Sequence, residues 1–499
     1  MPSRLFATKS IDTLRADAAG EHGLKRALGA VDLVLLGIGA IIGTGIFVLT
    51  GQAAADNAGP AVVLSFVVAG IASGFAGLCY AEMASMIPIA GSAYTYSYAT
   101  MGELIAWIIG WDLILEYLVA SAAVSVGWSG YAVAFVHDVL GVTLAKTWTS
   151  APFVYDEAAR QFHATGAVLN IPAMLITAIV TVILVIGIKE SARFNSVIVT
   201  VKIVVVLMFI AFCARYVHPQ YWHPFIPPQE APGRFGMSGV MRGAARVFFA
   251  YIGFDAVSTA AQETRNPQRD LPRGILGSLA VCTVLYVAVS LILTGLVPYQ
   301  QLGVPHPIAL GVEATGQIWL ATFVEVGAIA GLSSVMLVMM MGQPRIFFSM
   351  AHDGLLPPGA ARVHPRFGTP WVTTIITGVA VAIAGGVLPV GVLAQLTSVG
   401  TLFAFVLVSI GVLILRRSRP DIPRGFRVPG GTYLVPLCGA ATSLYLMLQE
   451  TTGTLIRLFG WMAIGLAVYF LYSRKHSKLA VPSQSPVAAS STAQGNGPL

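Results

Sequence analysis

The sequence predicts an all-α, polytopic membrane protein, and three observations support this fold class. Hydrophobic residues make up 56% of the 499 positions and charged residues only 10%, whereas soluble domains carry about 25% charged residues. Apolar runs of about 20 residues, long enough to cross a bilayer as a helix, recur along the chain. Two of these runs, the first and the sixth, contain residues that interrupt a helix. The composition excludes a set of soluble domains, and membrane orientation explains the net charge of +7 better than nucleic-acid binding does.

Twelve transmembrane helices are expected from the apolar runs. The polar segment 1–27 reads as a cytoplasmic tail rather than a cleaved signal, and residues 474–499 read as a disordered cytoplasmic tail. The third run is too long for one straight span, so part of it, around Tyr94–Tyr98, is expected at the inner surface. The runs lie at 28–52, 58–87, 97–136, 166–190, 191–216, 234–262, 272–299, 316–346, 369–390, 391–418, 431–450 and 453–473.

The distribution of lysine and arginine indicates how these helices are oriented. With the N-terminus inside, 21 of the 29 basic residues fall in inner segments and 7 in outer segments, while Lys202 lies within a span. Inner loops of membrane proteins carry this kind of excess. We therefore expect a multi-pass protein of the cell (inner) membrane, surrounded by lipid, with both termini in the cytoplasm.

The first apolar run is rich in glycine, at Gly37, Gly39, Gly43 and Gly45. A glycine inside a helix costs roughly 0.5–1 kcal/mol relative to alanine. Such a run indicates either a helix that opens in mid-membrane, exposing polar backbone groups, or a face that packs closely against another helix. The glycines alone leave both interpretations open.

The sixth run contains a second candidate interruption, between Phe248 and Ala256, with one glycine and the intramembrane Asp255. Interrupted segments at matching positions of two halves are typical of transporters built from inverted repeats. The expected organisation is a first five-helix repeat at 28–216, a second, inverted one at 234–418, and two further helices at 431–473.

The backbone at two such interruptions would suit an amino acid. The start of a helix favours a carboxylate, because its N–H groups are unsatisfied and its dipole end is positive. The carbonyl groups where a helix ends suit an ammonium group. The predicted donors are the N–H groups of Gly43, Thr44 and Gly45, and the predicted acceptors are the carbonyl groups of Ile41, Ile42, Phe249, Ala250 and Ile252.

Several motifs spread over nearly the whole chain point in the same direction. They are Gly37–Phe47 (GIGAIIGTGIF), Tyr80–Glu82, Pro88–Tyr94, Phe248–Ala256, Glu263–Pro272 and Asp353–Pro357. In combination they resemble the amino acid–polyamine–organocation superfamily, and most closely the bacterial branch of its cationic amino acid transporter family. Members often carry two acidic residues before the Asn-Pro of the fifth motif, whereas here Gln262 precedes Glu263.

The resemblance implies a LeuT-type fold, with five-plus-five inverted repeats and broken helices 1 and 6, and amino acid transport by alternating access. It also implies that Lys202 takes the place where sodium-coupled relatives hold a cation, as a protonatable group contacting the broken part of helix 1. Lys202 lies nine residues past Arg193, about 14 Å along a helix and close to the bilayer middle. A purely structural role, with the lysine bonded to nearby carbonyls, is the alternative.

Glu116 lies one helical turn from Asp112 in the third run, and the resemblance places it near the central site as a proton relay or a partner for a cationic group. A protonated glutamic acid hydrogen-bonded within the bundle is the alternative. Phe254 is expected as an aromatic gate after the second interruption. Met339 is expected to wall the side-chain pocket and to favour small neutral substrates over arginine or lysine, although a methionine in a span often only fills space.

The sequence thus predicts a proton-coupled amino acid importer with no enzymatic motif. Amino acid or polyamine exchange on the same fold is the first alternative, and a non-transporting membrane sensor is the second.

The expected partners are an L-amino acid, protons, lipid and, as an option, a small single-span accessory subunit. No cofactor is expected, and no histidine or cysteine pair has a metal-binding spacing. Glu325, toward the outer end of the eighth run, is expected to be mostly structural.

Overall fold

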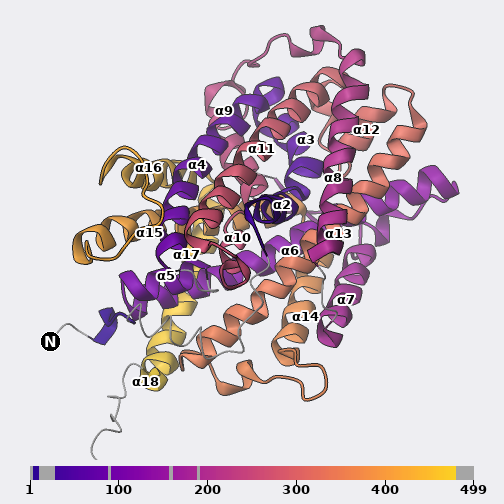
Figure 1. The fold of residues 1–499 in the computed structure, drawn as a ribbon. Coiled ribbons are helices and arrows are strands. Elements are labelled where there is room, and N and C mark those ends of the chain that lie inside the picture. Colours follow the sequence, from indigo (N-terminus) through magenta and orange to yellow (C-terminus); the bar gives the residue numbers. More distant parts are fainter. Residues whose placement is uncertain (1–3, 10–27, 88–91, 157–160, 188–191, 479–499) are drawn as a thin grey trace, which may run out of the picture.

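The computed structural model describes residues 4–9, 28–87, 92–156, 161–187 and 192–478. These residues form a helical bundle with one small hairpin (Figure 1). The α-helices are α2 (Ala30–Ile41), α3 (Thr50–Ala53), α4 (Val62–Met86), α5 (Ser92–Thr100), α6 (Glu103–Leu140), α7 (Ile171–Ile186), α8 (Ala192–Cys213), α9 (Gly236–Val247), α10 (Ala256–Thr259), α11 (Pro267–Leu296), α12 (Pro307–Glu313), α13 (Ile318–His352), α14 (Trp371–Val387), α15 (Val390–Ser418), α16 (Leu434–Gln449), α17 (Thr452–Val468) and α18 (Arg474–His476).

Short 3-10 and π segments, labelled η, join or extend these helices. They are η1 (Arg4–Phe6), η2 (Gly45–Leu49), η3 (Ala54–Ala58), η4 (Gly59–Ala61), η5 (Lys146–Trp148), η6 (Ala214–Tyr216), η7 (Pro219–Trp222), η8 (Phe248–Tyr251), η9 (Ala261–Glu263), η10 (Tyr299–Gln301), η11 (Pro358–Ala361) and η12 (Tyr469–Ser473). The strands β1 (Phe153–Asp156) and β2 (Gln161–Ala164) pair antiparallel, with Phe153 opposite Ala164. They lie in the long loop after α6, where the sequence analysis expected no strand.

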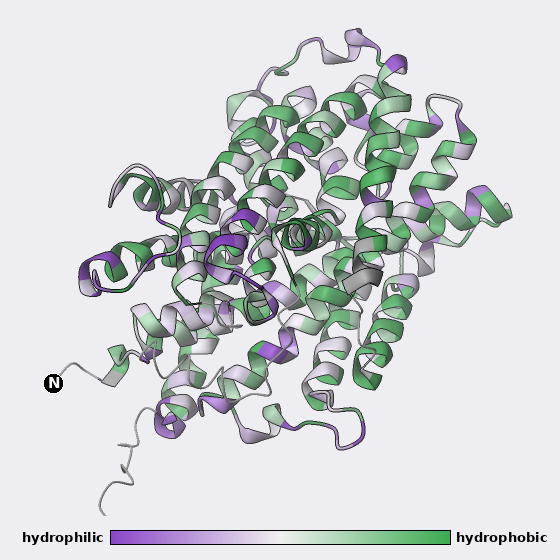
Figure 2. Ribbon diagram, in the orientation of Figure 1, coloured by the Kyte–Doolittle hydropathy of each residue, from purple (hydrophilic) through white to green (hydrophobic). Residues whose placement is uncertain are grey.

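The helices have the composition of a multi-pass membrane protein. Within the described residues, seven helical segments are long and apolar enough to cross a bilayer, and four shorter apolar helices accompany them. Figure 2 shows hydrophobic residues over most of the long helices and hydrophilic ones gathered mainly in loops and at helix ends. Large apolar side chains such as Leu175, Ile376 and Leu448 are more than half exposed, as lipid-facing residues are. Each of the twelve predicted runs contains a helix, while the twelve-span inverted repeat itself stays a prediction.

The helix of the first apolar run is interrupted after Ile41. Ile42 has extended backbone angles (φ −73°, ψ 100°), and the chain becomes helical again as the π segment η2, which begins at Gly45. The sixth run is interrupted in the same way. Helix α9 continues into η8, Ile252 is extended (ψ 138°), and α10 begins at Ala256. Both interruptions expected from the sequence are therefore present.

The two interruptions pack against each other through glycine. Gly253 has a φ of 113°, which favours glycine, and a Cβ there would lie 2.9 Å from the carbonyl group of Ala40. A Cβ on Gly45 would lie 2.3 Å from the Cα of Ala250. Close packing and an open helix, the two interpretations of the glycine run, thus apply together, because the open segments contact each other directly.

Two groups of helices surround this junction. Helix α11 packs on α2 and α4, and α4 packs on α9, which makes a first set; helices α6, α7, α13 and α14 form a second packed set. Helix α8 contacts both sets through α2 and α13, and α15 does so through α4 and α6. Helix α2 lies at the centre of the molecule and is seen nearly end-on in Figure 1.

The ends of the described chain are anchored on one face. Lys9 Nζ lies 3.1 Å from Asp353 Oδ1, and the Ser477 hydroxyl donates to Glu103. The expected tails are therefore structured at residues 4–9 and 474–478, the latter including α18. The remaining tail residues and the motif piece 88–91 lie outside the described residues. The expected surface segment around Tyr94–Tyr98 is the separate helix α5.

Candidate functional site

A narrow cavity lies at the junction of the two interrupted helices, between them and helices α6 and α13. It has room for little more than a single water molecule, so a larger guest requires the surrounding helices to move. Its lining consists of Ala40, Ile41, Gly43, Thr44, Gly45, Ala120, Val124, Phe249, Ile252, Val335 and Met339.

The cavity lining brings together seven of the predicted substrate-binding residues. These are Ile41, Gly43, Thr44, Gly45, Phe249, Ile252 and Met339. The predicted residues Ile42, Ala250 and Phe254 are buried nearby but do not line the cavity. Ala120 and Val124 of α6 and Val335 of α13 also line the cavity and were not predicted, because small apolar residues in a long apolar helix carry no local signal of a site.

The hydroxyl of Thr44 is the polar side-chain group of this lining. Thr44 is buried, and among the described residues its Oγ1 has no hydrogen-bond partner. Burying a hydroxyl without a partner is unfavourable. It lies directly before η2, whose first N–H groups lack acceptors within the helix. Hydroxyl and backbone donors therefore gather at one end of the cavity.

Tyr286 of α11 connects the two interruptions. Its hydroxyl oxygen lies 2.9 Å from the carbonyl oxygen of Ile41 and 2.7 Å from that of Ala250. A hydroxyl has one proton, so the two carbonyls share it. Each carbonyl group has two lone pairs and keeps part of its accepting capacity. Nothing in the sequence singles out this tyrosine, because its role depends on two segments that lie far from it along the chain.

Lys202 of α8 is fully buried and binds the backbone of α2. Its Nζ donates to the carbonyl oxygen of Gly39 at 2.8 Å, one turn before the interruption. Its aliphatic chain packs on Gly331 of α13, where a Cβ would lie 3.1 Å from the lysine Cγ. Lys202 does not line the cavity. It contacts the broken helix outside the cavity lining, and its role as a protonatable group stays a prediction.

Glu116 lies on α6 in a buried acidic group. Its neighbours are Thr401 of α15, Asp255 at the second interruption and Asp112 one turn away. Both carboxylate oxygens of Asp112 are buried without a hydrogen-bond partner among the described residues. Glu116 does not line the cavity, and the group lies beside it.

Phe254 lies in an aromatic cluster rather than at the cavity wall. Its ring centroid is 5.0 Å from that of Phe405 and 5.5 Å from that of Tyr80, and Phe248 also contacts Phe405. The cluster joins the second interruption to α4 and α15. The wall of the cavity includes Phe249, Ile252 and Met339 instead.

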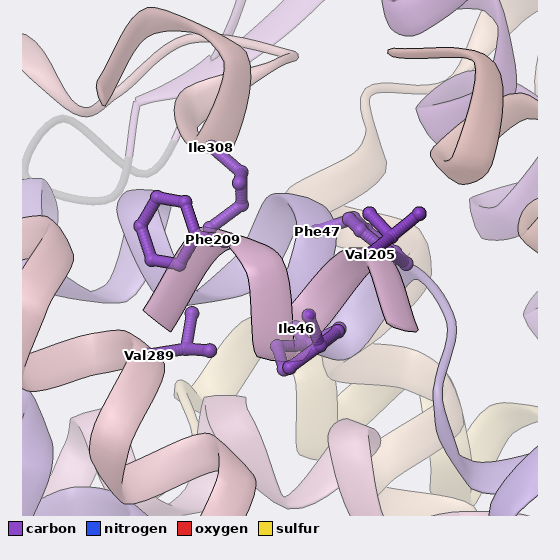
Figure 3. Close-up of a pocket in the computed structure, with 7 residues that line it drawn as sticks. Ile46, Phe47, Val205, Phe209, Val289 and Ile308 are labelled. Carbon is purple, nitrogen blue, oxygen red and sulfur yellow. The ribbon is translucent and has the colours of Figure 1, made fainter. Parts of the chain in front are cut away.

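A second cavity lies on the other side of η2 and is shown in Figure 3. Seven apolar side chains line it, Ile46 and Phe47 of η2 with Val205, Val206, Phe209, Val289 and Ile308. Because this lining offers no polar side chain, the cavity lacks the groups that would orient a polar substrate. We therefore place the candidate site in the first cavity.

Comparisons with known proteins agree with the geometry. The model of the amino acid permease family matches residues 28–474. The chain is 51% identical over 480 residues (96% of this chain, 100% of the relative) to the branched-chain amino acid permease BcaP of Bacillus subtilis (strain 168). It is 48% identical over 479 residues (96% of this chain, 99% of the relative) to the methylthioribose transporter of the same organism.

A plant relative extends the comparison. The chain is 39% identical over 405 residues (81% of this chain, 65% of the relative) to the vacuolar cationic amino acid transporter 4 of Arabidopsis thaliana. The match to the family model and the near-complete coverage of the bacterial relatives show to which family the chain belongs. The chain belongs to the amino acid permease family of membrane transporters.

Proposed function

We propose that this permease imports neutral, apolar amino acids by alternating access, coupled to protons. The observation that carries the proposal is the cavity between the two interrupted helices. It combines backbone groups for a carboxylate and an ammonium with an apolar wall for a side chain. It lies near the middle of the bundle, where substrate sites of inverted-repeat transporters are found.

The substrate carboxylate would bind at Gly43, Thr44 and Gly45. These residues supply backbone N–H groups at the start of a helix and the unpartnered Thr44 hydroxyl. Thr44 thus gains a hydrogen bond only when the site is filled.

The substrate ammonium would bind carbonyl groups at the two interruptions. Because Tyr286 already occupies part of the accepting capacity of Ile41 and Ala250, and the N–H group of Ile252 part of that of Phe249, the carbonyls of Ile42 and Ile252 are the better candidates. Tyr286 holds the two broken segments in register for this contact. The role of Ala250 is then to pack against Gly45, where no larger residue fits.

The substrate side chain would face Ala120, Val124, Val335 and Met339. None of the described residues of the lining carries a charge, so the cationic end of arginine or lysine would find no charged partner in the lining. This supports a neutral aliphatic substrate. The branched-chain substrate in the name of the 51% identical Bacillus relative supports the same class.

Lys202 would carry the coupled proton. When protonated, it holds α8 against Gly39 beside the interruption. Loss of the proton removes the charge from this contact and loosens α2 from α8. The two packed sets of helices would then rock against each other, with α2 moving relative to α8 and α13. Glu116, in its acidic group beside the site, would relay the proton toward the inner side, with both chain ends cytoplasmic.

Methylthioribose transport is a second candidate, because the 48% identical relative is named for it. That sugar thioether has neither an ammonium nor a carboxylate group, so it would leave the backbone groups of both interruptions without charged partners. Uptake of radiolabelled leucine into proteoliposomes, challenged with unlabelled amino acids and with methylthioribose, separates the two. Inhibition by valine and isoleucine but not by lysine or methylthioribose supports the proposal, and inhibition by methylthioribose alone contradicts it.

Exchange is tested with the same vesicles. We expect empty proteoliposomes to accumulate leucine when a pH gradient is imposed. Uptake that requires internal amino acid and ignores the gradient would establish an exchanger instead.

A further inference from the structure

Three acidic side chains from separate elements meet at the end of the molecule opposite to the anchored chain ends. Asp138 lies near the end of α6, Glu313 ends α12, and Glu325 lies in the first turns of α13. One carboxylate oxygen from each lies within 4.8 Å of the others. This end faces outward in the proposed orientation.

Glu325 supplies an independent sign of a missing ligand. It is fully buried, and among the described residues its carboxylate oxygens have no hydrogen-bond partner outside this cluster, where Asp138 is its neighbour. A buried carboxylate is strongly unfavourable unless it is paired or bound to a cation. Within the described part of the chain, no lysine or arginine forms an ion pair with any of the three carboxylates.

We propose that Asp138, Glu313 and Glu325 bind a hard divalent cation of the Ca²⁺ type. Ca²⁺ takes six to eight oxygen ligands at about 2.3–2.6 Å, so oxygens on opposite sides of it lie up to about 5 Å apart. Three oxygens within 4.8 Å of one another can therefore share one ion. Mg²⁺, with ligands at about 2.0–2.1 Å, would require a tighter arrangement. Since Asp138 and Glu313 are exposed, water completes the coordination.

A neighbouring group orients one of the ligands. The Nδ1 atom of His137 lies 2.7 Å from Asp138 Oδ1, the kind of outer contact that fixes a carboxylate beside a metal. The sequence analysis found no metal-binding spacing, because the three ligands are separated by long stretches of chain and converge only through the fold.

The cation would hold helix α12 in place over the broken first helix. Helix α12 packs on η2, α3 and α13. A Cβ on Gly51 of α3 would lie 2.4 Å from Pro307 at the start of α12, so the contact is tight. An ion bound by Glu313 together with Asp138 and Glu325 would connect α12 to α6 and α13. The bound ion thereby stabilises the state in which the outer half of the broken helix is covered.

Calorimetric titration of the purified full-length protein tests this site. After EDTA treatment, CaCl₂ is expected to bind one site with a Kd of about 1 mM or tighter, and MgCl₂ to bind about tenfold more weakly. Glu325→Gln and Asp138→Asn should each abolish the binding heat. Glu230→Gln is the matched control, since Glu230 is an exposed carboxylate paired with Arg234 outside the cluster; it should bind Ca²⁺ like the wild type.

Thermal unfolding provides a second readout that does not require transport. Millimolar Ca²⁺ should raise the Tm of the wild type and of Glu230→Gln but not of Asp138→Asn. Asp138 is exposed, so this variant tests the site even if Glu325→Gln fails to fold. Absence of Ca²⁺ binding in the wild type would overturn the proposal, as would equal binding in all variants. A higher Tm of Glu325→Gln without any Ca²⁺ binding would instead show that the cluster holds only a shared proton.

Discussion

The side-chain nitrogen of Lys202 lies 2.8 Å from the carbonyl oxygen of Gly39. This contact joins α8 to the last turn of α2, directly before the backbone opens at Ile42. Lys202 is fully buried and binds the last turn of the helix that opens at Ile42. A change in the charge of Lys202 can therefore shift the backbone that lines the candidate site. The proposed proton coupling rests on this relationship.

Lys202→Met should abolish accumulation driven by a pH gradient. Methionine keeps the length and apolar bulk of the lysine chain and removes the group that can gain or lose a proton. We expect the accumulation ratio of leucine to fall by at least roughly fivefold, the lower range of coupling between two sites. Uptake by proteoliposomes with and without the gradient measures this. Lys146→Met, at a lysine in the exposed segment η5, should behave like the wild type, and a gradient response preserved in Lys202→Met would refute the role of Lys202.

Met339→Ser should broaden the range of substrates. The shorter, polar side chain enlarges the pocket and removes apolar contact, so inhibition of leucine uptake by isoleucine should weaken by roughly tenfold, while larger polar amino acids begin to compete. Met336→Ser is the matched control, because Met336 is buried in the same helix and does not line the cavity. An inhibition profile of Met339→Ser identical to that of the control would contradict the pocket assignment.

Tyr286→Phe should impair transport more than it impairs stability. The change removes the hydroxyl that joins the carbonyls of Ile41 and Ala250, at a cost of about 1 kcal/mol for the hydrogen bond. Tyr251→Phe removes a comparable bond, from the Tyr251 hydroxyl to the carbonyl oxygen of Phe66, at a residue that does not itself line the cavity. We expect similar Tm values for both variants, with leucine uptake lost only in Tyr286→Phe. Equal uptake by the two would show that Tyr286 only stabilises the fold.

Glu82→Gln should destabilise the protein strongly. Glu82 lies fully buried near the end of α4, and its carboxylate accepts from Arg416 Nε at 2.8 Å and from the backbone N–H of Val428 at 2.9 Å. Removing one charge of a buried pair leaves the other uncompensated, which costs roughly 3–5 kcal/mol. Asp421→Asn, at the exposed pair of Asp421 with Arg419, serves as the control and should leave the Tm unchanged. Thermal unfolding in detergent measures both, and equal Tm values for the two variants would argue against a buried, essential pair.

The sequence predicted those parts of the site that depend on backbone chemistry. The glycines of the first run indicated an opening, and the structure places it at Ile42 and Gly43. Lys202 stood out because a charge in mid-membrane is costly wherever the fold places it. Both signals are local, so one sequence is enough to reveal them.

The remaining features depend on which segments meet in space. Tyr286 can bridge the two interruptions only because α11 lies within hydrogen-bond distance of both. The cluster of Asp138, Glu313 and Glu325 joins residues from three elements. Phe254, predicted as an aromatic gate after the second interruption, packs with Tyr80 and Phe405, and its gating role stays a prediction. Such outcomes follow from tertiary packing and leave no mark in the local sequence.

Proton movement that accompanies amino acid entry tests the central claim most directly. Proteoliposomes that hold a trapped pH-sensitive dye are supplied with external leucine, and the internal pH is followed without any imposed gradient. The account predicts that leucine acidifies the lumen in wild-type vesicles and leaves it unchanged in Lys202→Met vesicles. Leucine entry into wild-type vesicles with no change in internal pH would contradict proton symport.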